Sequence, residues 1–124
     1  AAQHATPEEI KVLRDLMAAD AKLVSDPNAM SRANRRFHKQ IHLASHNRFL
    51  VQQLDLVHRS MALLATTSIA AEGRGHQTLQ EHEAIVAAIE AGDGDAAYQA
   101  LRDHISEAFV TRLKLDAQAV EAAE

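Results

Sequence analysis

The chain has 124 residues, enough for a single domain over residues 1–124 with a buried core, and its 47% hydrophobic content favours a folded globule over disorder. The formal net charge of -4 gives no basic surface for phosphates, so this segment is not expected to bind nucleic acid by itself. The sequence has no cysteine, which excludes disulfides and thiolate sites, and no apolar run long enough to cross a membrane, so we expect a cytoplasmic protein.

Ala is abundant while Gly, Pro and aromatic residues are scarce, and this balance predicts an all-α fold. Three polar residues can accept hydrogen bonds from the free N–H groups at helix starts: Thr6, Asp26 and Asn47. A capping box of Thr78 and Glu81 is expected to open a fourth helix that Gly92 closes, and the tail AQAVEAAE is expected to fray. The expected helices cover about residues 7–23, 27–46, 47–70, 78–91 and 94–119.

Eight histidines are many for this length, and helical periodicity turns three of them inward. His82 and His104 lie within the apolar stripes of the fourth and fifth helices, each three residues after a leucine. His38 lies beside the apolar stripe of the second helix, with Asn34 one turn before it. Three helices are therefore expected to direct an imidazole toward the middle of the domain.

Three imidazoles in an apolar interior suggest a metal site. Their removal from water is costly unless each gains a partner, and one divalent cation satisfies all three while keeping them neutral. Zn, Ni, Fe or Mn would accept three nitrogens and the amide oxygen of Asn34, leaving coordination positions for water or a carboxylate. The alternative is that each imidazole is an ordinary core histidine with its own hydrogen bond.

Two other function classes stay open. An enzyme could use three histidines and an open metal position to activate water. A general base beside the site is missing, however, because Glu81 and Glu83 flank His82 and should point sideways or outward, and Lys39 stands where the zincin motif H-E-x-x-H requires Glu. We therefore expect no enzymatic activity. The other alternative is a structural helical domain that serves dimerisation and holds no metal.

The run NRRFHKQIHLASHN, followed by LQEHEAIVAAIEAGDGDAA and then LRDHI, resembles a known domain family. It is similar to the FCD domain, the ligand-binding C-terminal domain of GntR-family bacterial transcription regulators of the FadR type. That family shows Asp, or sometimes Asn, before Phe-His, then Glu-His-x-x-Ile, and a closing His one helix later. The resemblance covers about residues 30–110, and the motifs are specific in combination.

The resemblance implies an antiparallel bundle of about six helices, a bound metal, a small organic acid as effector, and a homodimer. The implied metal ligands are Asn34, His38, His82 and His104, whose histidines are those that periodicity turns inward. Asn34 stands where Asp is commoner, and its neutral oxygen is a weaker donor to the metal. The family also has an N-terminal winged helix-turn-helix, which this chain lacks, so DNA contact is expected only through that absent domain.

A small carboxylate effector is expected to meet the metal and to take hydrogen bonds from the third helix. Arg59, flanked by leucines, is a candidate contact for the anion, and Thr66 and Thr67 are candidate hydroxyl contacts. The alternatives are a solvated or interface arginine, and threonines that bond back to their own helix. His42, one turn beyond a predicted metal ligand, is a further candidate that faces the effector.

Overall fold

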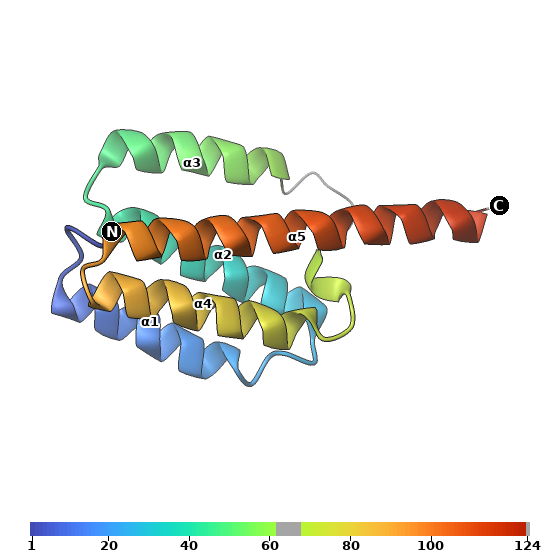
Figure 1. Ribbon diagram of the computed structural model, residues 1–124, viewed down its shortest axis with the longest axis horizontal. Helices are drawn as coiled ribbons and strands as arrows, with labels where there is room; N and C mark the ends of the chain where they lie inside the picture. Colours follow the sequence, from blue (N-terminus) through green and yellow to red (C-terminus); the bar gives the residue numbers. More distant parts are fainter. Residues whose placement is uncertain (62–67, 124) are drawn as a thin grey trace.

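The computed structural model describes residues 1–61 and 68–123, which form a bundle of helices (Figure 1). Within these residues there are five α-helices, one 3-10 helix and no strand, which confirms the all-α class although about six helices were expected. The elements are α1 (Pro7–Asp20), α2 (Pro27–Ala44), α3 (Arg48–Met61), η1 (Ser68–Ala70), α4 (Arg74–Glu90) and α5 (Gly94–Ala123). None of the helices in the described part is long and apolar enough to cross a membrane.

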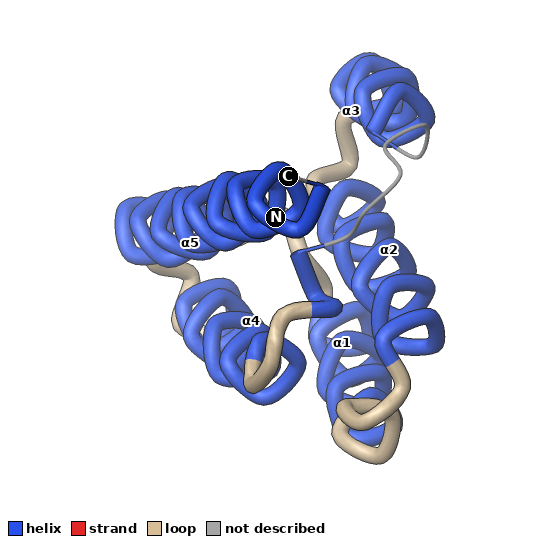
Figure 2. Tube along the Cα trace, turned by 90° about the vertical axis from the view of Figure 1, so that its right-hand side faces the viewer, coloured by secondary structure: helices blue, strands red, loops and turns tan. Residues whose placement is uncertain are grey.

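Four helices, α1, α2, α4 and α5, surround the core, and α3 lies at the edge of the bundle (Figure 2). α4 packs against both α1 and α5, while α1 packs against α2. The short η1 contacts α2, α4 and α5, and α3 packs on α2. The second helix therefore has the core on one side and α3 on the other.

Polar caps start the first three helices as the sequence predicts. The Thr6 hydroxyl, the Asp26 carboxylate and the Asn47 amide oxygen each accept a hydrogen bond from a backbone N–H two or three residues later, at 3.2, 3.1 and 3.1 Å. Gly92 follows α4 with φ +68°, the left-handed conformation of a C-terminal glycine cap. These predicted helix ends are confirmed.

Three predicted boundaries differ from the structure. α1 ends at Asp20 rather than near residue 23, because tight turns bonded to the carbonyls of its last residues follow directly. α5 continues to Ala123 instead of fraying, since its tail is rich in the strong helix former Ala. Residues 68–70 form a 3-10 helix rather than the end of a long third helix.

The start of α4 is the largest correction. This helix begins at Arg74, one turn before the predicted capping box, so Thr78 is buried inside it and caps nothing. Gly73 precedes it with φ +75°, which glycine adopts without steric cost. At Gly75 a Cβ would lie 3.0 Å from a carbonyl oxygen in the loop between α1 and α2. The start of α4 therefore uses two glycines, Gly73 for its left-handed conformation and Gly75 for the close approach of the loop.

The centre of the core is a cluster from three helices: Leu13, Phe37, Ile85, Val86 and Ile89. The first residues of α5 pack against this cluster through partly buried alanines and Leu101. Burial of each large apolar side chain contributes about 2 kcal/mol, which holds α1, α2 and α4 together around one core. Phe37 is fully buried, so the residue after it, His38, is carried to the interior as well.

Asp20 ends α1 with its carboxylate in the interior. The residue is 2% exposed, and one of its oxygens has no hydrogen-bond partner among the described residues. The Arg36 guanidinium lies 4.0 Å from it. Burial raises the pKa of Asp20 above its ordinary value of 3.8, and Arg36 only partly opposes this shift.

We expect Asp20→Asn to raise the free energy of unfolding at pH 7. The pKa of Asp20 is higher in the folded protein than in the unfolded one, so protonated Asp20 is compatible with the fold at low pH. As the pH rises through the folded pKa, the buried carboxyl ionises and the protein loses stability. Asparagine does not ionise, so the stability gained by Asp20→Asn should shrink as the pH falls toward about 4. Urea denaturation at several pH values measures it, with the exposed Asp15→Asn as control. A less stable Asp20→Asn protein at pH 7 would contradict the assignment.

Candidate metal centre

Three histidines from three helices meet in the interior of the bundle. His38 lies on α2, His82 on α4 and His104 on α5, and these residues are 6%, 1% and 3% exposed. One ring nitrogen of each lies within 4.8 Å of one ring nitrogen of both others. The structure thus brings together the three imidazoles that helical periodicity turns inward.

The core fixes the orientation of the His82 ring. Phe37 stacks on it with 3.9 Å between the ring centroids and 11° between the planes. The rings of His38 and His104 then approach His82 edge to face, with centroids 5.3 and 4.9 Å away. A fully buried phenyl ring is well suited to this task because it has a single packed position. The packing of the core therefore extends without a break into the histidine cluster.

Glu81 is a contact residue that the sequence analysis missed. It was expected to point sideways or outward, but its Oε1 lies 2.6 Å from Nδ1 of His104. The same carboxylate accepts two hydrogen bonds from the buried Arg74, at 2.7 and 2.8 Å. Arg74 and Glu81 are seven residues apart, two helical turns on one face. That signal was hidden because the helix was predicted to begin after Arg74.

The Nε2 atoms of His38 and His104 lie 3.2 Å apart. Because the carboxylate of Glu81 accepts the Nδ1–H of neutral His104, the lone pair of His104 lies on Nε2. Neutral His38 can then donate its Nε2–H to that lone pair. Two nitrogens bound to one tetrahedral ion at about 2.1 Å are about 3.4 Å apart. The observed spacing therefore suits one shared proton or one shared cation.

The interior keeps these imidazoles uncharged. Burial, together with the neighbouring imidazoles, lowers the pKa of His38 to about 3 and that of His82 to about 2. Burial also lowers the pKa of His104, although the hydrogen bond to Glu81 opposes this shift. Neutral imidazole is the form that offers a lone pair to a metal. All three rings are thus ready to bind a cation at neutral pH.

Several buried polar atoms in the cluster and on the helices that carry it have no hydrogen-bond partner within the described residues. They include both ring nitrogens of His82 and the amide oxygen of Asn34, which lies one turn before His38 on α2. Unpaired buried nitrogens and oxygens are uncommon because each forfeits its hydrogen bonds to water. A cation bound by nitrogen and oxygen donors would give a partner to one ring nitrogen of His82 and to the Asn34 oxygen, so the donor set fits the metal that the sequence predicts.

The predicted effector contacts divide into two groups. Thr66 and Thr67 lie outside the described residues. Arg59 and His42 line a groove of about 350 Å³ between α2 and α3, together with four further polar residues: Arg35, Lys39, Asp55 and His58. The rings of His42 and His58 lie 5.1 Å apart, and His58 lies 6.3 Å from His38. The groove is therefore next to the histidine cluster.

Positive charge exceeds negative charge in this groove. Its lining includes three cationic side chains and one carboxylate, although the whole chain has a formal net charge of -4. Lys39 and Asp55 pair at 2.7 Å, so the two arginines, Arg35 and Arg59, are the excess. Guanidinium groups bind carboxylates with paired hydrogen bonds. The groove between α2 and α3 is therefore chemically suited to a small anion.

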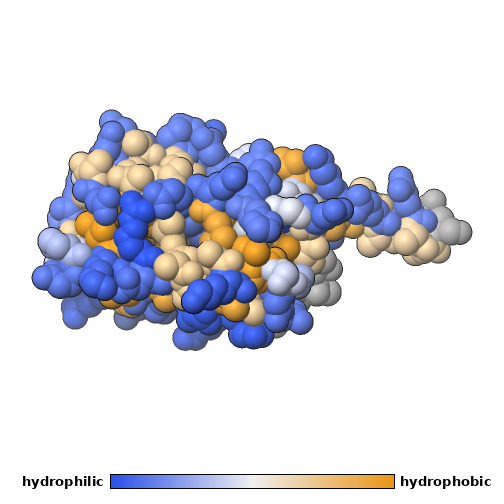
Figure 3. Space-filling model, turned by 90° about the horizontal axis from the view of Figure 1, so that it is seen from below, coloured by the Kyte–Doolittle hydropathy of each residue, from blue (hydrophilic) through white to orange (hydrophobic). Residues whose placement is uncertain are grey.

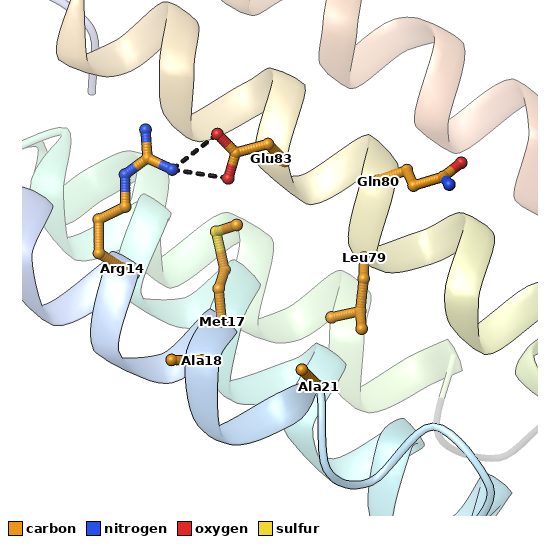
Figure 4. Close-up of a pocket in the computed structure, with 7 residues that line it drawn as sticks. All are labelled: Arg14, Met17, Ala18, Ala21, Leu79, Gln80 and Glu83. Atoms are coloured by element: carbon orange, nitrogen blue, oxygen red, sulfur yellow. Dashed lines mark hydrogen bonds and ion pairs between the residues drawn. The ribbon is translucent and has the colours of Figure 1, made fainter.

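A second groove, of about 530 Å³, lies between α1 and α4 (Figure 4). Met17 and Leu79 line it, and Arg14 crosses to Glu83 with hydrogen bonds of 2.7 and 2.6 Å. A space-filling view from below Figure 1 shows hydrophobic residues between hydrophilic ones on that face (Figure 3). None of the clustered histidines lines this groove, so its larger volume does not make it part of the candidate site.

Comparison with known proteins supports one family. The model of the FCD domain matches residues 1–107. The chain is 32% identical over 120 residues to the putative L-lactate dehydrogenase operon regulatory protein of Escherichia coli K12, covering 94% of the chain and 46% of that protein. It is 34% identical over 102 residues to the galactonate operon transcriptional repressor of the same organism, covering 81% and 44%. The chain spans about half the length of these curated relatives.

We expect His82→Leu to abolish stabilisation by zinc without lowering the stability of the metal-free protein. Leucine removes two unpaired nitrogens and keeps a similar volume, a change that is near neutral or stabilising. In the unsubstituted protein, zinc at about 100 times its dissociation constant should add about 2.7 kcal/mol to the free energy of unfolding. Thermal unfolding with chelator and with zinc measures both effects.

The matched control is His76→Leu, an exposed position on the same helix, which should keep the zinc response. A large loss of metal-free stability in the His82→Leu protein would mean that the ring is well paired after all.

Proposed function

Because this chain belongs to the FCD family, found in GntR-type operon regulators, we propose that it senses a small organic acid at a metal held by Asn34, His38, His82 and His104. The relatives are named as a regulatory protein and a repressor, and the chain is a regulatory domain rather than an enzyme. Control of transcription would pass to a DNA-binding part elsewhere in the regulator, in the cytoplasm.

One observation carries the metal assignment: three buried, neutral imidazoles from separate helices lie within 4.8 Å of one another, and both nitrogens of His82 are unpaired within the described residues. Zinc, nickel, iron or manganese suits three imidazoles and one oxygen. When bound, the metal would supply an open coordination position for an anion. Its four protein donors would all be neutral, so a negative ligand would be favoured there.

The groove between α2 and α3 supports a carboxylate as that ligand. Arg59, Arg35 and His42 line it, and His58 connects it to His38. The two relatives are named for an L-lactate dehydrogenase operon and a galactonate operon, and lactate and galactonate are both hydroxy acids. We therefore propose a hydroxy carboxylic acid as the effector class. Thr66 and Thr67 remain candidate contacts for its hydroxyl groups.

The binding of the effector would act through differential affinity. A ligand shifts an equilibrium between two arrangements only as far as it prefers one of them. An acid that contacts α2 and α3 at once would favour the arrangement in which these helices lie close together. In a homodimer, which we propose as the working form, the same shift would occur in both copies and reach the attached DNA-binding parts together.

Metal content is the first test. Protein purified without chelator or histidine tag should contain about one transition metal ion per chain, and His38→Ala should lose it because one of three nitrogen donors is gone. Elemental analysis measures the content, with His76→Ala as the matched control. If the unsubstituted protein lacks metal and cannot be loaded with zinc, nickel, iron or manganese, the metal part of the proposal is wrong.

Effector binding is the second test. Calorimetry of the metal-loaded protein with a panel of hydroxy acids, including lactate and galactonate, should find at least one ligand. Arg59→Gln should lower the affinity for that ligand by about tenfold, which corresponds to one charge-assisted hydrogen bond, and should leave the metal content unchanged.

The control is Arg48→Gln on the same helix. The Arg48 guanidinium lies over the Phe49 ring, and Arg48 does not line the groove. Equal affinities for the Arg59 and Arg48 variants would remove Arg59 from the effector site.

A further inference from the structure

A chain of three side chains, two of them buried and one partly buried, ends at the histidine cluster. The Arg74 guanidinium donates to both oxygens of Glu81, at 2.8 and 2.7 Å, and Oε1 of Glu81 accepts from Nδ1 of His104 at 2.6 Å. Arg74 is 2% exposed, and the Glu81 side chain is 17% exposed. The chain crosses from α4 to α5, so it also links the two helices on which His82 and His104 stand.

We propose that Glu81, held by Arg74, is a positioning residue that fixes His104 as a metal ligand through Nε2. This inference rests on the proposed metal site and adds to it. A carboxylate that accepts the Nδ1–H sets the tautomer and the orientation of the ring, and it makes the opposite nitrogen a stronger donor. Nε2 of His104 is the atom that faces His38 at 3.2 Å.

The ion pair is difficult to explain by stability alone. A buried arginine and carboxylate lose much of their hydration, and their attraction often only balances that loss. The guanidinium of Arg74 nevertheless faces both oxygens of Glu81, at 2.8 and 2.7 Å, while Oε1 of the same carboxylate still reaches Nδ1 of His104. Arg74 thus holds the carboxylate in the position from which it contacts His104.

The three histidines differ in this respect. Within the described residues, both nitrogens of His82 are unpaired, and Nε2 of His38 has the His104 ring as its hydrogen-bond partner. Among the described residues, His104 is the one histidine of the three whose ring nitrogen contacts a carboxylate, that of Glu81. It is therefore the ligand whose geometry is set before a metal arrives. To bind a metal through Nε2, neutral His38 would give up its hydrogen bond to His104, and its ring proton would move to Nδ1, which gives the other neutral tautomer.

Zinc affinity measured by competition with a chromophoric chelator tests the proposal. Glu81→Gln keeps a hydrogen-bond acceptor but removes the charge, and Glu81→Ala removes both. We expect zinc to bind about 10-fold more weakly in the first and up to about 100-fold more weakly in the second. Glu83→Gln is the matched control, two residues along the same helix and paired with Arg14 on the outside, and it should bind zinc as tightly as the unsubstituted protein.

A spectroscopic measurement needs no variant and covers the case in which these proteins fold poorly. The ¹⁵N ring resonances of His104 in the unsubstituted protein should show a proton on Nδ1 both without zinc and with it, and only Nε2 should shift on zinc binding. A proton on Nε2, zinc on Nδ1, or unchanged zinc affinity in folded Glu81 variants would overturn the proposal. If the unsubstituted protein binds none of zinc, nickel, iron and manganese, the metal site fails as well. If it binds zinc and the Glu81 variants match it, only the role of Glu81 fails.

Discussion

The rest of the structure depends on keeping three imidazoles neutral in an apolar interior. A protonated ring there would be a desolvated charge next to two other imidazole rings. Burial holds the pKa values of His38 and His82 far below neutral pH. Neutral rings have free lone pairs, so the packing that protects the core also prepares the donors. Phe37 belongs to the core and also contacts the histidine cluster, since it fills the core and stacks on His82. Stability and the candidate site are therefore not separate parts of this domain.

Much of this could be predicted from the sequence because the signals are local. Caps at Thr6, Asp26 and Asn47 and the phase of each histidine within its helix need only the residues within one or two turns. Glu81 could not be placed in this way. Its role depends on where α4 begins, and the first turn of α4 includes a close approach of Gly75 to a loop far away in the sequence. Contacts between helices, such as that from Glu81 to His104, need the fold.

The two grooves of the bundle show that size and chemistry are separate. The lining of the larger one, between α1 and α4, includes Met17, Leu79 and two alanines, and its Arg14 is already paired with Glu83. The smaller one, between α2 and α3, has excess positive charge and lies against the histidine cluster. In a chain with a formal net charge of -4, a concentration of arginines at one concave place is informative. It marks where an anion would be attracted from solution.

The length of α5 gives small movements at the cluster a long reach. His104 is anchored among the other histidines, and the helix continues from there to Ala123, beyond the rest of the bundle (Figure 1). Those 19 residues extend about 29 Å at 1.5 Å per residue. A tilt of about 5° at His104 would displace the far end by about 2.5 Å, roughly half a helical turn. The helix that supplies one imidazole is thus also a lever arm whose fulcrum lies at the candidate metal site.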